Sequence, residues 1–340
     1  METSYSRAME LPMSKVDGNM IKSFFTLLEG RDCMPFDEFI QWVLYDHENG
    51  YYQKDRQRVG KLFGSDFYTS TSLGSIWGEL IIESSKRLLG ERSAEEFVFV
   101  EIGAEPGCSI LDGLDHPFAS HQIIRLGDQL DIPNQAIIYS NEWLDAQPFK
   151  RFKFDQKENQ WLELFVGLED DRFIEIEKGT STPIIKNFPN QPLSTYYLDW
   201  PSGSISALNE LIQQRNWKGV FLTFDYGLDA HTLLNDRPEG TARAYFQHKM
   251  EKNLLLNPGN QDLTCHLCWD SLEEALEKAD FKKISLTNQE SFFMNHAVGC
   301  IQKIFEERGN PLNPKILALR ELLHPAHLGH GMQALSAVRF

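Results

Sequence analysis

Phe97-Val-Phe-Val-Glu-Ile-Gly-Ala-Glu-Pro-Gly107 is the stretch of sequence that decides the fold. Its first four residues form an apolar run, which predicts a buried strand. Gly103 and Gly107 then open a turn where a helix is expected to start, and such a turn lets backbone N–H groups come close to a nucleotide-like ligand. A further glycine is typical midway between them, but this chain has Glu105. The stretch therefore predicts a nucleotide-type site with one departure from the pattern.

Strand-like and helix-like segments alternate through the middle of the chain. Strands are expected at the apolar runs 97–102, 121–126, 136–140 and 220–225, and helices near 108–114 and at 208–215. This alternation predicts an α/β fold with a mainly parallel sheet covered by helices. Later segments continue it with strands at 242–249, 263–269 and 283–286 and a helix at 271–279. The late strands favour an antiparallel edge.

The part of the chain before this sheet has a different pattern. Residues 1–20 are expected to form a loose tail, and apolar residues at helical spacing between Ile21 and Leu44 predict helices. A glycine-punctuated loop follows, and then a further helix at 76–89. We therefore expect a tail (1–20), a helical and lid region (21–90) and an α/β domain (91–340) with a β insertion around 228–262.

Composition limits the classes of partner. The 340 residues carry a formal net charge of -16, which argues against nucleic-acid or anionic-membrane binding, because Lys and Arg must neutralise phosphates there. Residues 1–20 lack the apolar core of a signal peptide, and no run approaches the ~20 apolar residues of a membrane span. The five cysteines, an odd number, then predict reduced thiols in a cytoplasmic protein.

Several motifs besides the glycine turn follow one another along the chain. They are Leu44-Tyr-Asp-His-Glu-Asn-Gly-Tyr-Tyr52, Gly64-Ser-Asp-Phe-Tyr-Thr-Ser70, Glu101-Ile-Gly with Gly107, Ser140-Asn-Glu-Trp-Leu-Asp-Ala-Gln-Pro148, Phe224-Asp-Tyr-Gly227, Gly240-Thr-Ala-Arg-Ala-Tyr245, Pro258-Gly-Asn-Gln-Asp-Leu-Thr-Cys-His266 and Leu322-Leu-His-Pro-Ala-His-Leu-Gly329. In this order they resemble the MidA-type family of class I S-adenosylmethionine-dependent methyltransferases, from about residue 21 to 340. The resemblance implies a Rossmann-like fold, S-adenosylmethionine as cofactor and a protein substrate. Mitochondrial members of that family methylate an arginine during assembly of respiratory complex I.

The resemblance assigns a cofactor site to the glycine turn and to a lid. Gly103 and Gly107, with Glu101 before them, would cradle the cofactor. Glu105 would either oppose the carboxylate of the cofactor or take its amino group. The lid is a family segment that folds over the cofactor. Its matching residues here are Asp66, Phe67 and Thr69.

The interval between the glycine turn and Asn141 is short. From Gly107 to Asn141 the chain advances 34 positions, and one βαβ unit takes ~30 residues or more. A complete class I methyltransferase has two strands with their helices in this interval, so we expect one strand–helix pair to be absent or abbreviated between residues 108 and 136. Asp128 lies 25 positions after Gly103, near the ~20 expected for a ribose-binding acid, unless it belongs to a later strand of the family.

Polar residues directly follow the apolar strand at 136–140. Asn141 and Glu142 lie at its carboxyl end, where open α/β sheets place ligands, and Asp145 is within reach if a helical turn starts there. An arginine acceptor is cationic and a poor nucleophile, so carboxylates must orient it. The run 140–143 is also similar to the substrate-glutamate loop of protein arginine methyltransferases. We expect Glu142, Asn141 and Asp145 to be catalytic; alternatively, Asn141 and Asp145 only cap the next helix.

Three further residues are candidates for the substrate side. Asp225 ends the strand at 220–225 on the same face, although it could cap a helix or pair with Arg243. Arg243 and His266 lie in family-like segments, and His266 could equally be a buried, hydrogen-bonded histidine. Cys265 and Cys268 form a CxxC pair, but residues three apart on a strand point to opposite faces, so we expect no metal site.

The favoured function is an S-adenosylmethionine-dependent methyltransferase that acts on a protein side chain, an arginine by resemblance. The alternative is a catalytically degenerate relative that serves as a binding or assembly factor. Glu105 and the short central interval support that alternative. A Rossmann-type dehydrogenase is a third possibility, which the later motifs do not fit.

Overall fold

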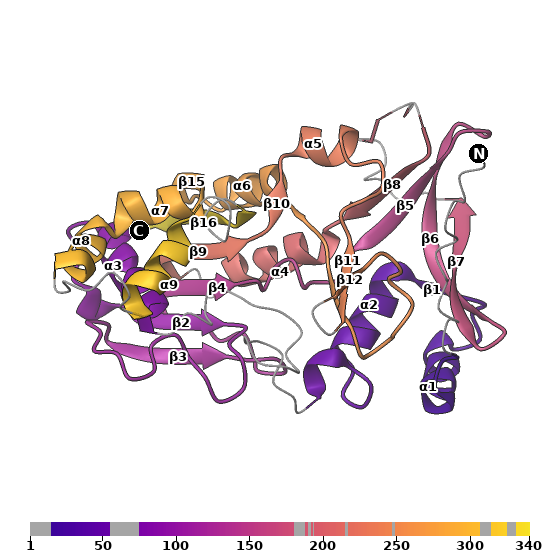
Figure 1. Ribbon diagram of the computed structural model, residues 1–340, viewed down its shortest axis with the longest axis horizontal. Coiled ribbons are helices and arrows are strands. Elements are labelled where there is room, and N and C mark those ends of the chain that lie inside the picture. The colour runs from indigo at the N-terminus through magenta and orange to yellow at the C-terminus, as the bar shows by residue number, and fades with distance from the viewer. Residues whose placement is uncertain are drawn as a thin grey trace, which may run out of the picture.

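The computed structural model describes residues 15–54, 75–179, 188–189, 192, 194–214, 217–246, 249–306, 314–324 and 331–340. These residues form two lobes that lie side by side along the long axis of the molecule (Figure 1). One lobe contains a helix-covered sheet, and the other contains an antiparallel sheet with two helices. None of the described helices is both long enough and apolar enough to cross a bilayer.

The first lobe is built on a six-stranded sheet with the order β15-β16-β9-β4-β2-β3. Its strands are β2 (Val98–Ile102), β3 (Ser120–Ile124), β4 (Gln135–Asn141), β9 (Lys218–Asp225), β15 (Lys282–Asn288) and β16 (Gln333–Arg339). β3, β2, β4 and β9 are parallel neighbours, whereas β16 is antiparallel to both β9 and β15. The mainly parallel, Rossmann-like sheet is therefore confirmed, and its antiparallel strand lies next to the edge.

Helices cover both faces of this sheet (Figure 1). Alternate residues of a strand point to opposite faces, so Tyr139 packs in one core and Ile138 in the other. The first core is completed by α3 (Ser75–Leu89), α7 (Gln289–His296), α8 (Val298–Glu306) and α9 (Pro314–Leu323). The second is completed by α4 (Ser202–Gln213) and α6 (Trp269–Lys278).

A single strand, β3, occupies the interval between β2 and β4. The flanking residues 103–119 and 125–134 are all described, and they contain turns but no helix. The absence of one strand–helix pair is therefore confirmed. The helix expected near 108–114 was a wrong prediction, because Gly107 and Gly113 adopt left-handed φ values of 73° and 71° that do not continue a helix.

α3 packs closely against the turn that replaces this helix. A Cβ atom added at Gly78 would lie 2.1 Å from the Ile110 carbonyl oxygen and 2.5 Å from Leu114 Cδ1. We therefore expect Gly78→Ala to lower the free energy of unfolding by about 1–3 kcal/mol, measured by urea denaturation. Gly299→Ala on α8 is the matched control, because a Cβ there meets nothing within 4 Å. Equal effects of the two substitutions would contradict the close packing.

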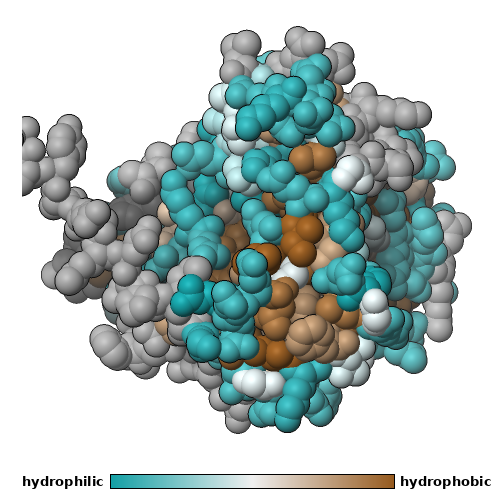
Figure 2. Space-filling model, turned by 90° about the vertical axis from the view of Figure 1, so that its right-hand side faces the viewer, coloured by the Kyte–Doolittle hydropathy of each residue, from teal (hydrophilic) through white to brown (hydrophobic). Residues whose placement is uncertain are grey.

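The second lobe contains a five-stranded antiparallel sheet that we did not predict from the sequence. Its strands are β1 (Met34–Pro35), β5 (Lys150–Asp155), β6 (Gln160–Glu169), β7 (Arg172–Gly179) and β8 (Tyr196–Trp200). α1 (Gly18–Leu28) and α2 (Phe36–Tyr45) pack on it through Phe24 and Phe39, whose rings contact Phe173. Figure 2 views the molecule from this end, where apolar residues gather in a hollow between polar ones.

A small three-stranded sheet lies between the lobes (Figure 1). It consists of β11 (Arg243–Phe246), β12 (Lys249–Glu251) and β13 (Asp262–Thr264). With α5 (Ala230–Asn235) it occupies the region of the expected insertion around 228–262. The single strand expected at 263–269 is divided, since β13 ends at Thr264 and β14 (Leu267–Cys268) pairs with β10 (Gly227–Leu228) before α6 begins.

Candidate functional site

The carboxyl ends of β2, β4 and β9 bring the candidate residues to one edge of the central sheet. Ile102 is the register partner of Ser140, and Asn141 is the partner of Phe224. Gly103, Asn141 and Asp225 therefore come at the ends of three adjacent parallel strands. The expectation that they share one edge is confirmed, and this is the edge where such sheets hold ligands.

The glycine turn has the backbone that its motif requires. Gly103 and Gly107 have left-handed φ values of 79° and 73°. A Cβ at Gly103 would also lie 3.3 Å from Trp143 Cδ1, so this glycine lets the loop after β4 approach the turn. Glu105, by contrast, is not among the residues with positive φ, so its backbone does not need a glycine. The departure from the motif is therefore one of side-chain volume and charge.

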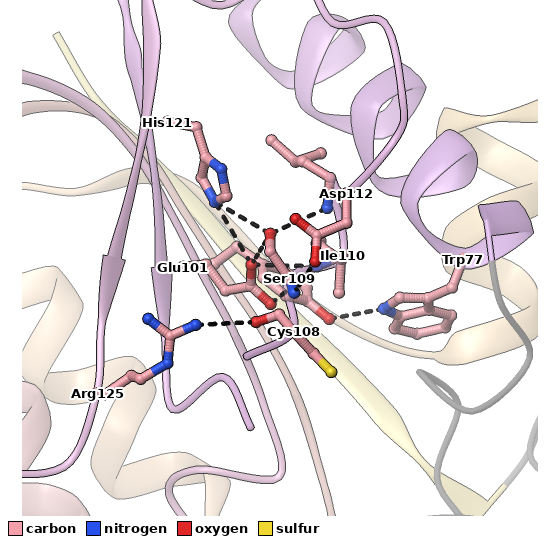
Figure 3. Close-up of polar contacts among 10 residues, drawn as sticks. Trp77, Glu101, Cys108, Ser109, Ile110, Asp112, His121 and Arg125 are labelled. Carbon is pink, nitrogen blue, oxygen red and sulfur yellow. Dashed lines mark hydrogen bonds and ion pairs between the residues drawn. The ribbon is translucent and has the colours of Figure 1, made fainter. Parts of the chain in front are cut away.

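Glu101 is tied into a network beneath the turn rather than left open to a ligand (Figure 3). Its buried carboxylate accepts hydrogen bonds from Ser109 Oγ at 2.6 Å and from the Ile110 N–H at 3.2 Å, and it lies 3.6 Å from His121 Nε2. Burial raises the pKa of Glu101 and lowers the pKa of His121. The network fixes the chain after Gly107 against β3.

Asp128 follows β3, which is the parallel neighbour of β2. The side chain is exposed and turned back on its own loop, where Oδ2 accepts the Arg125 N–H at 2.7 Å. Its assigned role at the ribose stays a prediction. Asp66, Phe67 and Thr69 of the expected lid lie outside the described residues.

Asp225 holds the loop that carries the other candidate carboxylates. Its fully buried carboxylate accepts the N–H groups of Leu144 at 3.0 Å, Asp145 at 3.3 Å and Tyr226 at 2.9 Å. It therefore caps the turn after β4 and not a helix, since residues 142–149 contain none. Arg243 instead donates to the carbonyl oxygen of Ala242 at 2.7 Å.

The pKa of each of the three carboxyl groups at this edge is raised. Burial, followed by the charge of Asp225, raises the pKa of Glu142 to about 8. Burial raises the pKa of Asp225 to about 7 and the pKa of Asp145 well above its usual range. Because Asp225 already accepts three backbone N–H groups, we assign the proton of the hydrogen-bonded Asp145–Asp225 pair to Asp145.

Glu142 itself is held in an unusual backbone conformation. Its φ is 49°, a left-handed value that is uncommon for a side chain of this size. The Glu142 N–H donates to the carbonyl oxygen of Phe224 at 2.9 Å, and Asn141 Nδ2 donates to Glu142 Oε1 at 3.0 Å. The sheet thus fixes the direction of this carboxyl, and Asn141 acts as its hydrogen-bond partner.

Two tyrosines from the helical region pack over this acidic edge, and sequence reasoning did not identify them. Tyr45 Oη donates to the carbonyl oxygen of Ala146 at 2.7 Å, and Tyr52 Oη donates to Asp262 Oδ1 at 2.8 Å. Their rings stack with centroids 5.3 Å apart. They position the loop after β4 and the start of β13. The only available signal was that Tyr45, Tyr52 and Asp262 all lie inside family-like motifs.

Arg243 and His266 are brought together on neighbouring segments. Arg243 on β11 pairs with Thr264 on β13, two residues before His266. Burial, and then the charge of Arg243, lower the pKa of His266 to about 4. The imidazole is therefore neutral at physiological pH, and a ring nitrogen could accept a hydrogen bond there.

The two thiols of the CxxC pair enter different cores. Cys265 packs with α1 and α2 of the second lobe, whereas Cys268 packs with Phe152 and Leu233. The Cys268 Sγ also accepts a hydrogen bond from Ser271 Oγ at 3.3 Å. The two cysteines do not lie on one continuous strand, since β13 ends at Thr264 and β14 begins at Leu267.

Comparison with known proteins relates this chain to methyltransferases. Residues 119–287 match a family model described as "Putative S-adenosyl-L-methionine-dependent methyltransferase". No curated protein gives a significant match. Two solved structures from Burkholderia thailandensis are similar, each over 94% of this chain and 91% of its own. One is a superfamily member and "likely methyl transferase" bound to S-adenosyl-homocysteine, with a TM-score of 0.81 and 19% identity. The other is an uncharacterized member of the same superfamily, with a TM-score of 0.77 and 17% identity.

The structural likeness supports the class I fold, and the family model covers β3, β4, β9 and the loops that carry Glu142 and Asp225. The match over residues 119–287 and the class I fold together support a MidA-type family of S-adenosylmethionine-dependent methyltransferases.

Proposed function

We propose that this protein transfers a methyl group from S-adenosylmethionine to a guanidinium nitrogen of an arginine in a protein substrate. The observation that carries the proposal is the set of three desolvated carboxyls beside the glycine turn. Burial alone makes such a cluster unfavourable, and a bound cation with several N–H donors would offset that cost. A neutral hydroxyl acceptor would offset little of it.

Residues at the glycine turn fit a nucleotide-like cofactor through their backbone. Gly107 leaves its end of the turn open, because a Cβ there would meet nothing within 4 Å, whereas the Gly103 N–H donates to the carbonyl oxygen of Ile124 at 3.0 Å. S-adenosylmethionine, when bound, supplies an electrophilic methyl group. The B. thailandensis neighbour that holds S-adenosyl-homocysteine supports this assignment.

Glu142 is the residue proposed to act on the acceptor. As a carboxylate it would accept two guanidinium N–H groups and align one nitrogen for in-line displacement. As the new N–C bond forms, the methylated nitrogen loses a proton, and Glu142 would take it. A pKa of about 8 suits that exchange near neutral pH. Asp225 and Asp145 would fix the loop after β4 and add negative charge beside the bound guanidinium.

A second candidate function is a binding or assembly factor that no longer transfers methyl groups. Glu105 in the turn and the absent strand–helix pair favour it, since both affect the cofactor side of the site. The two functions differ in whether the chain binds S-adenosylmethionine.

Calorimetry with S-adenosylmethionine and S-adenosylhomocysteine tests the cofactor assignment. We expect weak binding to the wild type and about 5–10-fold tighter binding to Glu105→Gly, because the substitution removes volume and like charge from the turn. Glu91→Gly, in an exposed turn, is the matched control and should leave affinity unchanged. If neither wild type nor Glu105→Gly binds either ligand at millimolar concentration, the cofactor proposal is lost and the binding-factor function is the better account.

A further inference from the structure

The strand beside the glycine turn is followed by an arginine where a carboxylate is the usual group. In nucleotide-binding sheets of this type, an acidic residue about 20 positions after the glycine turn binds the ribose hydroxyls. β3 is the parallel neighbour of β2 and ends at Ile124. The next residue, 22 positions after Gly103, is Arg125. The acidic residue closest in sequence, Asp128, is exposed and bonded to the Arg125 N–H.

Arg125 points toward the glycine turn (Figure 3). Its Nη2 donates to the carbonyl oxygen of Cys108 at 3.1 Å, one residue after Gly107. Its Nε is buried and has no hydrogen-bond partner among the described residues. The guanidinium therefore ties the end of the turn to β3 with one of its donors.

A guanidinium cannot replace a carboxylate at a ribose diol. The two ribose hydroxyls need acceptors for their O–H groups, and a carboxylate provides them, whereas a guanidinium has donors only. Hydrogen bonds to a charged group are stronger than those between neutral groups. An adenosyl ligand bound here would lose that contribution.

We propose that Arg125 has taken the place of the ribose-binding carboxylate and acts as a positioning residue, which braces the glycine turn through Cys108 and sets the affinity for adenosyl ligands low. The inference rests on the proposed function, because it concerns the same cofactor site. According to this inference, Arg125 contributes to the low affinity together with Glu105.

The test measures binding of S-adenosylhomocysteine and of its 2′-deoxy analogue by calorimetry. Arg125→Glu should bind S-adenosylhomocysteine at least about 10-fold more tightly than the wild type does, which equals about 1.4 kcal/mol. The gain should largely disappear with the 2′-deoxy ligand, which lacks one of the hydroxyls. A merely structural role of Arg125 would produce no gain. Arg172→Glu, an exposed charge reversal on β7, is the control and should not change affinity.

Arg125→Gln covers the case in which the charge reversal prevents folding, as thermal melting would reveal. Its amide oxygen supplies one acceptor, so a smaller gain of about 3-fold is expected, again only with the ribose hydroxyl present. A loss of affinity in Arg125→Gln would mean that the arginine contacts the ligand, and the inference would be wrong. If Asp128→Asn instead changes the affinity for S-adenosylhomocysteine, the ribose contact belongs to Asp128, and the inference would also be wrong.

These outcomes separate the inference from the proposed function. Wild-type binding without any gain in the Arg125 variants overturns the inference alone. Tighter binding in Arg125→Glu, with no methyl transfer by any form, supports the inference and overturns the proposed function. No binding by any of the three forms overturns both.

Discussion

Glu142→Gln is expected to lower the rate of methyl transfer by about 10³-fold or more, while the affinity for S-adenosylmethionine stays within about 2-fold. The carboxylate has two acceptor oxygens and a charge, and the amide keeps one oxygen and no charge. Loss of one such electrostatic contact at a reacting centre costs about 10²–10³ in rate, and the lost proton acceptor adds to that. Transfer of labelled methyl groups to candidate proteins measures the rate.

The structure makes this substitution a clean test. The Glu142 backbone is fixed by its N–H bond to Phe224, so an amide of the same shape should not move the loop. Glu210→Gln on α4 is a matched control, since Glu210 is exposed and far from the edge of the sheet in sequence and fold. Equal transfer rates for wild type and Glu142→Gln would remove Glu142 from the reaction.

An inactive wild type would give this experiment a different meaning. The protein could bind S-adenosylmethionine and yet methylate none of its candidate protein partners. In that case the acceptor assignment fails, whereas the cofactor assignment stands. If the protein binds partners but no cofactor, the result supports the binding or assembly-factor function. The calorimetry on Glu105→Gly and Arg125→Glu decides between these cases without an activity assay.

The central sheet could be predicted because its strands are buried on both faces. β2, β4 and β9 each read as short apolar runs bounded by turns, and their carboxyl ends carry the polar residues of the site. Chain length between two motifs also sufficed to predict the missing strand–helix pair. Both inferences depend only on local sequence and on simple limits of chain geometry.

The antiparallel sheet of the second lobe could not be predicted in the same way. β6 is buried along most of its length, so the alternation that marks a half-exposed strand is missing there. β7, by contrast, is mostly polar and partly exposed. β6 gives no clear period of two, and β7 gives one only over Ile174-Glu-Ile-Glu177. The sheet forms because β6 pairs with β7, β5 and β1. The 108–114 error has a local cause, since the two left-handed glycines outweighed the apolar residues between them.

The site was only half visible in the sequence, because its second wall comes from distant parts of the chain. Tyr45 and Tyr52 contact Ala146 and Asp262 across 101 and 210 positions of sequence. No spacing rule relates such residues. Asp225 shows the same limit: its position at a strand end was evident, but its three backbone donors depend on the loop after β4.

The desolvated carboxyls predict opposite pH dependences for stability and for activity. Glu142 has a pKa of about 8 in the folded protein, against about 4.3 in an unfolded chain. Between these values the folded state holds a proton that the unfolded state has lost. The free energy of unfolding should therefore decrease as the pH rises from about 4.5 to about 8.

Glu142→Gln isolates this contribution, because an amide resembles the protonated carboxyl and does not titrate. We expect the variant to be as stable as the wild type near pH 4.5, within about 0.5 kcal/mol, and more stable by about 1–3 kcal/mol at pH 8 in urea denaturation. Methyl transfer by the wild type should change in the other direction, rising through the same interval, because only the ionised carboxylate binds a guanidinium. A stability difference that stays constant from pH 4.5 to 8 would mean that Glu142 is already ionised in the free protein. In that case a bound cation would no longer offset a cost of burial at Glu142, and the argument for a cationic acceptor would lose its main support.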